Sequence, residues 1–155
     1  MNDFERCLLR MYHRMFVANY AEQLSCENEK TILVSRSVYD SFAYIDTYYQ
    51  LGKFDEIEYD IFRKIRISLL PILQNTVILN PNVDVIMKRL EKRRINNERP
   101  ERDATFRFED SEKFVKLLHE NFKKYIENEN ILYITNNETE DIKKINDWIN
   151  RDENL

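Results

Sequence analysis

The stretch TVILNPNVDVIMKRLEKR, residues 76–93, indicates the fold class most directly. Its first four residues form a short apolar run of the kind that a buried parallel strand shows, and an Asn-Pro dipeptide ends the run. Residues 82–93 then have a helical pattern. Similar apolar runs at 31–34 and 131–134 are also separated by helical stretches. Strands that alternate with helices predict an α/β protein with a parallel sheet and right-handed crossovers.

Amphipathic patterns predict the helices of this fold at residues 3–24, 38–51, 56–74, 110–127 and 138–150. Gly52 stands in a capping position behind the second helix, and Pro71 bends or ends the third near its last turn. The last helix is expected to bury four apolar side chains: Ile142, Ile145, Trp148 and Ile149. We expect a single domain over 1–155, with a polar, lid-like segment at 94–108. A sheet of three strands would be small against the usual range of roughly four to six.

The composition excludes several classes of protein. Of 155 residues, 43% are hydrophobic and 34% are charged, which suits a globular protein and excludes a disordered tail. No apolar run approaches the ~20 residues that span a bilayer, and no signal-peptide pattern is present, so no membrane association is expected. Cys7 and Cys26 lack paired spacing and favour a reducing, cytoplasmic compartment. The net charge of -4 implies no nucleic-acid-binding surface.

The glycine content excludes a phosphate-binding loop in this chain. Gly52 is the only glycine, whereas glycine-rich phosphate cradles need several glycines at fixed offsets so that the backbone can wrap an anion closely. Neither GxxxxGK[ST] nor GxGxxG occurs in the sequence. No metal site is predicted, because Cys7 and His13 lack the spacing of metal ligands.

Arg36 is the first candidate binding residue. It follows the predicted strand at 31–34 and precedes a helix, and ligands of open parallel sheets bind at the carboxyl ends of the strands. An arginine at this place can bind a phosphate or a substrate oxygen with two parallel hydrogen bonds. The alternative is a surface arginine that pairs with a nearby carboxylate, and the position alone leaves both open.

The segment 88–107 is the second candidate, because it holds six of the chain's thirteen arginines. Arg89 and Arg93 lie four residues apart, on the same face of a helix. A cluster rich in arginine suits the clamping of phosphoryl oxygens during transfer. The alternative is a solvated helix end, where arginines are favoured by the negative end of the helix dipole.

Several stretches resemble the deoxynucleoside kinase family. SRSVYDSFAYIDTYYQLGKFDEIEYDIF (35–62) is similar to the family's Glu-Arg-Ser motif and the aromatic-rich helix behind it. LNPNVDVIMKRLEKRRINNE (79–98) resembles a strand, a turn and the arginine-rich lid, and FVKLLHENFKKYI (114–126) resembles the helix that follows the lid. The resemblance covers roughly residues 4–135. Thymidylate kinases share the general layout.

This resemblance implies an incomplete P-loop-kinase-like sheet and an enzyme that uses ATP and magnesium. Such an enzyme transfers the γ-phosphoryl group of ATP to the 5′-hydroxyl of a deoxynucleoside. Arg36 would act in catalysis, close to the substrate's 5′ oxygen and the transferring phosphate. Arg89 and Arg93 would hold the donor phosphates as lid arginines. Ile95 replaces the third lid arginine, and the adjacent Arg94 would substitute for it.

Four further residues take binding roles that the resemblance implies. Glu98 matches an acid that accepts a hydrogen bond from the sugar 3′-hydroxyl. Ser41 stands where thymidine-preferring members have a small residue, which favours a pyrimidine. Glu5 replaces a glutamine that reads the base. Glu138 lies near the loop that contacts the adenine of ATP.

The sequence departs from the family pattern in ways that bear on activity. Ser35 replaces the acid of the Glu-Arg-Ser motif. The family's first strand, its phosphate-binding loop and its general-base acid would all precede Met1, so we expect roughly 60–70 residues upstream and no turnover by this chain alone. The strands at 31–34 and 76–79 would flank the missing strand, and they would close up or accept a strand from another chain.

Three functions therefore remain open. The chain is part of a deoxynucleoside kinase that phosphorylates a pyrimidine deoxynucleoside, and it is inactive alone. Alternatively, it is a degenerate, non-catalytic kinase homologue that binds a protein through its exposed sheet, as a homodimer or with a complementing chain. In the third case it is an unrelated small α/β binding protein without affinity for nucleosides or phosphate.

Overall fold

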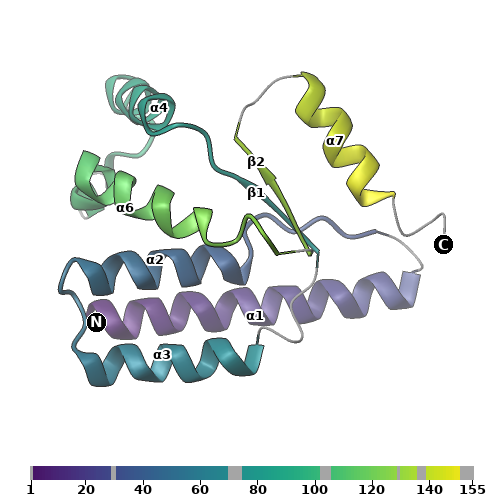
Figure 1. Ribbon diagram of the computed structural model, residues 1–155, viewed down its shortest axis with the longest axis horizontal. Helices are drawn as coiled ribbons and strands as arrows, with labels where there is room; N and C mark the ends of the chain where they lie inside the picture. Colours follow the sequence, from purple (N-terminus) through teal and green to yellow (C-terminus); the bar gives the residue numbers. More distant parts are fainter. Residues whose placement is uncertain are drawn as a thin grey trace. The chain divides into compact units, whose positions relative to one another are not determined.

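The computed structural model describes residues 2–28, 31–69, 75–101, 106–128, 130–135 and 139–150 (Figure 1). In chain order its elements are α1 (Asp3–Asn28), α2 (Val38–Gln50), α3 (Glu56–Leu69), β1 (Thr76–Leu79), α4 (Val83–Ile95), η2 (Arg107–Asp110), α6 (Glu112–Lys123), β2 (Ile131–Ile134) and α7 (Thr139–Ile149). Contacts divide the chain into two compact units, Met1–Leu73 and Gln74–Leu155. The division does not determine how many parts fold independently, so the single domain stays a prediction.

The predicted three-stranded sheet of an α/β, P-loop-kinase-like protein is wrong. The described residues contain one sheet of two parallel strands, in which Thr76 of β1 lies opposite Ile131 of β2. Most of the described chain is helical. Residues 31–34 form no regular structure and are exposed, with Leu33 at 78%. An apolar run becomes a strand only where a neighbouring strand satisfies its backbone N–H and C=O groups, and no described segment does so for 31–34.

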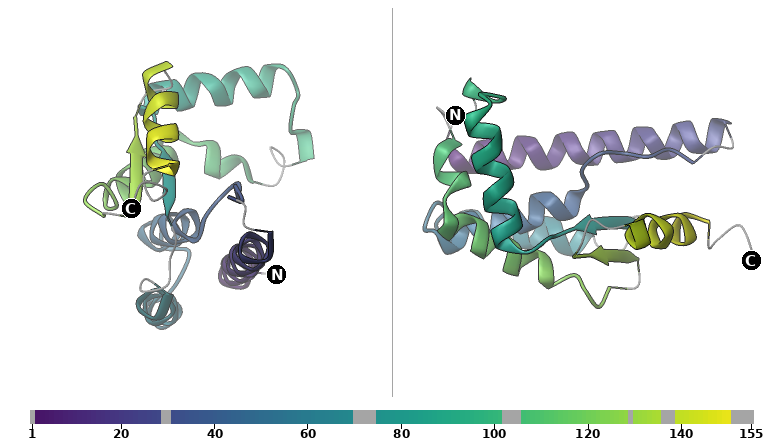
Figure 2. Two further views of the ribbon diagram at one scale, coloured as in Figure 1. Left: turned by 90° about the vertical axis from the view of Figure 1, so that its right-hand side faces the viewer. Right: turned by 90° about the horizontal axis from the view of Figure 1, so that it is seen from above.

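The N-terminal unit is a group of three helices. α2 packs against both α1 and α3 and runs in the opposite direction to them (Figure 1). Seen nearly end-on, the three helices lie at the corners of a triangle (Figure 2). Aromatic rings join them: the ring of Phe4 on α1 lies 5.1 Å from that of Phe62 on α3, and Phe54 lies 5.4 Å from Phe62. Large buried side chains of α2 complete the core: Tyr39, Phe42, Ile45 and Tyr48.

The ends of α2 follow from local chemistry. At its start, the carboxylate of Asp40 accepts a hydrogen bond from the backbone N–H of Ser37 at 2.9 Å, as in a capping box. At its end, Gly52 has a φ of 69°, and its N–H donates to the carbonyl of Tyr49 at 2.8 Å. The left-handed conformation there confirms the predicted capping role of Gly52, because glycine adopts it without steric cost.

The C-terminal unit is built around β1 and β2. The chain passes from β1 through α4, η2 and α6 to β2, which makes a parallel crossover. α4 packs against α6, and α7 contacts β2; Figure 1 shows α4 and α6 on one side of the strands and α7 on the other. The expectation that Ile142 is buried is wrong, since it is 62% exposed. Asp141, the preceding residue, is buried instead. The face of α7 that packs inward is therefore the one that carries Asp141.

The helices lie where their periodicity predicted them, with shifted ends. α1 continues to Asn28, and α6 spans only Glu112–Lys123. The lid-like segment 94–108 begins inside α4 and ends inside η2, and its residues 102–105 lie outside the described ranges, as does Pro71. Among the described helices, none combines the length and the apolar character that crossing a membrane requires.

Candidate functional site

Arg36 lies directly before α2, behind an irregular segment and not at the end of a strand. Its φ is 78°, in the left-handed region that residues other than glycine rarely adopt. Holding an arginine there costs roughly 1–2 kcal/mol. Its Nη1 lies 3.7 Å from Oδ1 of Asp40, and so exposed an ion pair contributes about 0–1 kcal/mol. Stability alone does not account for this residue, which supports a binding role.

Arg14 joins Arg36 from the neighbouring helix. Because α1 packs against α2, the Arg14 guanidinium lies within electrostatic reach of four side chains: Asp40, Arg36, Arg10 and Tyr44. Partial burial lowers the pKa of Arg14, the charge of Asp40 raises it, and the two other arginines lower it further. Arg14 forms no ion pair or hydrogen bond with any residue that the structure describes. A half-buried guanidinium in this state is costly, and an anionic ligand would offset the cost.

Asp40 holds this group together without neutralising it. Its Oδ2 accepts a hydrogen bond from the N–H of Ser37, its Oδ1 lies 3.7 Å from Nη1 of Arg36, and its charge also acts on Arg14. We call Arg10, Arg14, Arg36 and Asp40 the arginine cluster. Arg10 and Arg14 lie four residues apart on α1 and so share a face. The charges of Arg10 and Arg36 both act on Arg14, against the opposite charge of Asp40.

Ser41 follows Asp40 on α2 and is 7% exposed. Its Oγ has no hydrogen-bond partner among the described residues. Burying a hydroxyl without a partner costs about 1–3 kcal/mol. A helical serine usually avoids this cost by bonding to a backbone carbonyl one turn earlier. The buried hydroxyl of Ser41 is therefore an unsatisfied polar group near the start of α2.

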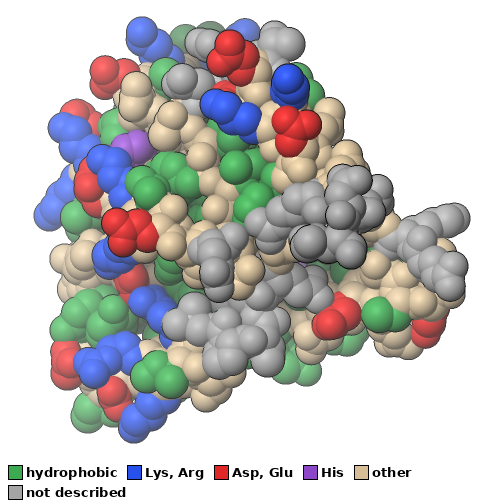
Figure 3. Space-filling view, turned by 45° about the vertical axis from the view of Figure 1, so that its right-hand side comes forward, with side chains coloured by type: hydrophobic (Ala, Val, Ile, Leu, Met, Phe, Trp, Pro, Cys, Tyr) green, Lys and Arg blue, Asp and Glu red, His purple; other side chains and the backbone are tan. Residues whose placement is uncertain are grey.

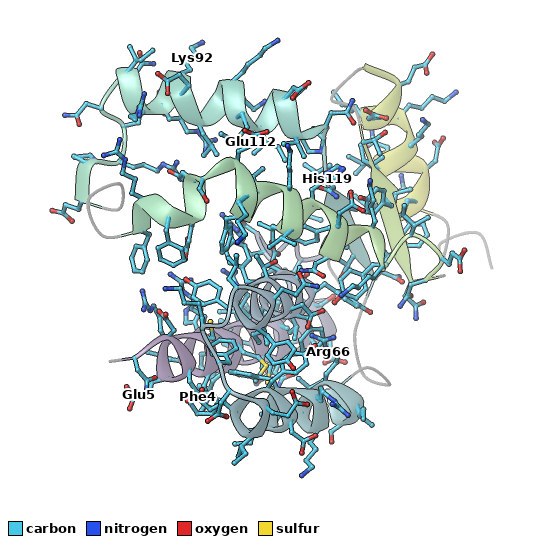
Figure 4. The ribbon with its side chains drawn as sticks, turned by 60° about the vertical axis from the view of Figure 1, so that its left-hand side comes forward. Phe4, Glu5, Arg66, Lys92, Glu112 and His119 are labelled. Carbon is cyan, nitrogen blue, oxygen red and sulfur yellow. The ribbon has the colours of Figure 1, made fainter. Side chains whose placement is uncertain are left out.

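The arginines of α4 are placed differently. α4 has no buried residue, and its last turn carries Lys92, Arg93 and Arg94, where they complement the helix dipole. Arg94 pairs with Glu91 at 2.7 Å, and Lys92 projects outward (Figure 4). Arg89 is exposed as well. This arrangement favours the solvated helix end over a phosphate clamp.

The remaining predicted site residues are not brought together. Glu98 lies 4.0 Å from Arg93 and accepts a hydrogen bond from Asn96. Glu5 lies at the outer end of α1 (Figure 4), where its carboxylate accepts the backbone N–H of Asn2 at 2.9 Å and caps the helix. Glu138 lies outside the described residues.

The described residues give no support for an ATP or magnesium site. A β-carbon added at Gly52 would meet nothing within 4 Å, so the role of this glycine is its left-handed backbone at the end of α2. No group of three or more His, Cys, Asp or Glu side chains that could hold a metal ion occurs in the described part of the chain. On the face drawn in Figure 3, basic and acidic side chains are interspersed.

A buried ion pair links α2 and α3 and has a structural role. Asp46 is 2% exposed and receives hydrogen bonds from Arg66 at 2.6 Å and from the hydroxyl of Tyr59 at 2.9 Å. The guanidinium of Arg66 also lies over the ring of Phe42, 4.8 Å from its centre. Burial, followed by the charge of Asp46, raises the pKa of Tyr59 to about 12.

A second buried polar group lies where β1 ends. The side chain of Asn80 contacts Nδ1 of His119 at 2.9 Å, donates to the carbonyl of His119 at 3.0 Å and also donates to the hydroxyl of Tyr133. Burial lowers the pKa of His119. These contacts fasten α6 to the two strands, so the interactions of His119 that the structure describes are structural.

A shallow hollow on the outer face of α3 is a weaker candidate. It is lined by Glu56, Ile57, Asp60, Ile61 and Lys64. Asp60 pairs with Lys64 at 2.8 Å, and Glu56 lies 3.6 Å from Arg63. Its charged groups already have partners, unlike Arg14, so the arginine cluster remains the best-supported site.

Sequence reasoning named Arg36 and Ser41 as candidate site residues and did not name Arg14. The four-residue spacing of Arg10 and Arg14 was the one available signal, but it does not show which helix these arginines face. Comparisons of the chain with protein-family models, curated proteins and solved structures found no match. The likeness to deoxynucleoside kinases therefore rests on the sequence motifs alone.

Proposed function

We propose that this chain binds a pyrimidine deoxynucleoside-type ligand at the start of α2, in the cytoplasm. The observation that carries the proposal is the left-handed backbone conformation of Arg36, beside Asp40. The strain of this conformation costs about as much free energy as the exposed ion pair with Asp40 contributes, or more. The motif resemblance gives this same residue the contact near the substrate's 5′ oxygen.

Each residue of the site has a chemical role in this proposal. The guanidinium of Arg36 donates hydrogen bonds to oxygens at the 5′ end of the ligand, and Asp40 holds it at the helix start. The hydroxyl of Ser41, buried and unpartnered among the described residues, donates to or accepts from the base. The peptide N–H groups at the start of α2 add partial positive charge.

We further propose that the chain does not transfer a phosphoryl group by itself. Transfer from ATP needs a loop that cradles the donor phosphates and a magnesium ion that bridges them. The proposal is supported by the sequence, which holds one glycine and no GxxxxGK[ST] motif. ATP-dependent phosphorylation of the nucleoside would require a phosphate-binding loop supplied by other residues than these.

A titration of the full chain with thymidine, followed by calorimetry, tests the binding proposal. We expect saturable binding that weakens about tenfold in Arg36→Gln, a loss of about 1.4 kcal/mol. Arg63→Gln is the matched control, because Arg63 is an exposed arginine of the same unit that pairs with Glu56. Equal affinity of all three proteins for thymidine would contradict the proposal.

A non-catalytic interaction module is the second candidate function. It is favoured by four apolar side chains of α1 that are each more than half exposed and recur at helical spacing: Leu9, Tyr12, Phe16 and Tyr20. Such a stripe on one helix face is typical of a protein contact. In this case light scattering should show a dimer that the double variant Tyr12→Ser/Phe16→Ser converts to a monomer. A wild-type monomer at all concentrations would contradict it.

A further inference from the structure

Three polar side chains, which we call the Asn80 clamp, join α6 to both strands: Asn80, His119 and Tyr133. Asn80 follows β1 and is 3% exposed, and His119 of α6 is 9% exposed. The amide nitrogen of Asn80 donates to the carbonyl of His119 at 3.0 Å and to the hydroxyl of Tyr133 on β2. One buried amide thus holds a helix and two strands together.

The hydrogen bonds of Asn80 determine which ring nitrogen of His119 carries a proton. Because a carbonyl oxygen only accepts, the amide nitrogen of Asn80 must face the carbonyl of His119, and its Oδ1 must face the imidazole. Nδ1 of His119, which lies 2.9 Å from this Oδ1, is therefore the donor. Nε2 is the atom to which a second proton would add.

The surroundings of the imidazole disfavour that second proton. Burial, followed by the positive charge of Lys123, lowers the pKa of His119. The charge of Glu120 and a hydrogen bond to the backbone of Pro81 act in the opposite direction and are the smaller causes. Burial raises the pKa of Tyr133, so its hydroxyl stays neutral, and no described side chain of α4, which packs against α6, acts on His119. A second proton would therefore put a positive charge in a buried place beside Lys123.

We propose that the Asn80 clamp is sensitive to acid, and that protonation of His119 releases α6 from β1 and β2. A histidine in an open chain binds a proton near pH 6.5. Because the pKa of His119 is lower than this in the closed state, the open state holds more protons below about pH 6.5. The closed state therefore has its full stability above that pH and loses stability as the pH falls. This inference goes beyond nucleoside binding, because the clamp lies entirely in the C-terminal unit.

Hydrogen exchange of single backbone amides, followed by NMR on the full chain, tests this inference. The N–H of Asn80 donates to the carbonyl of Ile134 at 2.8 Å, so its protection reports on the clamp. The N–H of Lys53, which donates to the carbonyl of Tyr48 in the N-terminal unit, is the internal control. After correction for the intrinsic pH dependence of exchange, we expect the protection of Asn80 to fall at least about threefold between about pH 7.5 and about pH 5. The protection of Lys53 should fall less.

Two exposed lysines of α6 give a matched pair of variants. Lys123→Gln removes the positive charge that opposes protonation of His119, so the loss of protection in acid should become smaller. Lys116→Gln removes a lysine that pairs with Glu112 at 2.6 Å, and it should retain the full loss. His119→Asn supplies an amide donor to Asn80 and does not titrate, so its clamp should not respond to acid.

Three results would overturn the inference. The first is a protection of Asn80 that does not fall in acid, and the second is an equal fall at Lys53, because the whole chain would then be unfolding. The third is an equal response to acid in Lys123→Gln and Lys116→Gln, because a group other than His119 would then cause the loss. None of these results bears on thymidine binding at the start of α2, which calorimetry measures separately.

Discussion

At the residue scale, Arg36 combines a backbone conformation that suits glycine with a side chain that glycine lacks. Its φ of 78° is unfavourable for any residue with a β-carbon. Asn97 also has a positive φ, of 51°, but asparagine tolerates this region because of its short polar side chain. Arginine has no short polar side chain of this kind. The backbone strain at Arg36 therefore supports the proposal that its guanidinium binds a ligand.

Arg36→Gly separates the two properties. Removing the β-carbon should stabilise the chain by about 1 kcal/mol, because the strain is relieved. The same change should weaken thymidine binding by about tenfold, as in Arg36→Gln, because the guanidinium is lost. Urea unfolding and calorimetry measure the two effects. A variant that is less stable than wild type would show that Arg36 serves the fold.

Tyr59 predicts a specific pH dependence of stability. Burial and the charge of Asp46 raise the pKa of Tyr59 to about 12, whereas an unfolded chain releases this proton near pH 10. The folded state therefore binds more protons between these values, and stability falls as the pH rises from about 10 to about 12. Tyr59→Phe should show a shallower fall in urea unfolding over this window. Parallel pH profiles for the two proteins would contradict this assignment.

Sequence reasoning identifies single residues where a motif marks them and fails where packing brings them together. Arg36 was named as a candidate because it is the central residue of a recognisable Ser-Arg-Ser stretch. Arg14 reaches the same site only because α1 packs on α2, a contact between residues far apart in the chain. Glu5 was expected to read a base, yet it bonds to Asn2, its capping partner, three residues away.

At the element scale, periodicity was a reliable guide to helices and an unreliable guide to strands. α1 and α2 were predictable because their apolar residues recur at helical spacing, and Gly52 marked the end of α2. A run of four apolar residues carries less information, since a strand also needs a partner. Residues 76–79 and 131–134 pair with each other, whereas 31–34, with an equally apolar sequence, has no described partner.

The pairing of α2 with α3 depends on Asp46 and Arg66. Asp46→Ala should destabilise the chain by about 3–5 kcal/mol in urea unfolding, because it leaves a guanidinium without its buried partner. Asp60→Ala is the matched control, because it breaks an exposed ion pair between Asp60 and Lys64 of α3. Little change in the free energy of unfolding is expected for this variant. Similar effects of the two substitutions would show that burial of the Asp46 pair is unimportant.

At the scale of the whole molecule, the described residues offer a candidate binding site, and the sequence holds no glycine-rich phosphate-binding motif. Its two-stranded sheet replaces the three-stranded one that the sequence predicted. The motifs that suggested a kinase mark local features, such as the start of α2 and the basic end of α4, and these can form without the complete sheet. These sequence motifs therefore predicted local structure, such as helix ends, better than they predicted the number of strands in the sheet.

The absence of a glycine-rich loop from the sequence predicts the result of an activity assay. The full chain, mixed with ATP, magnesium and thymidine, should produce no thymidine monophosphate above background. Radiolabelled ATP and chromatography of the products measure this directly. Turnover that disappears in Arg36→Gln would contradict the account, because it would require a phosphate cradle of a kind not recognised here.

The central claim is that a nucleoside-type ligand binds at the start of α2. The most direct measurement is an NMR titration of the isotopically labelled full chain with thymidine, with backbone amides as the probes. The account predicts saturable shifts at Arg36, Ser37 and Ser41 and at Arg14 of α1, with little change along α4. Absence of shifts at millimolar ligand, or shifts confined to α4 and Glu98, would contradict it.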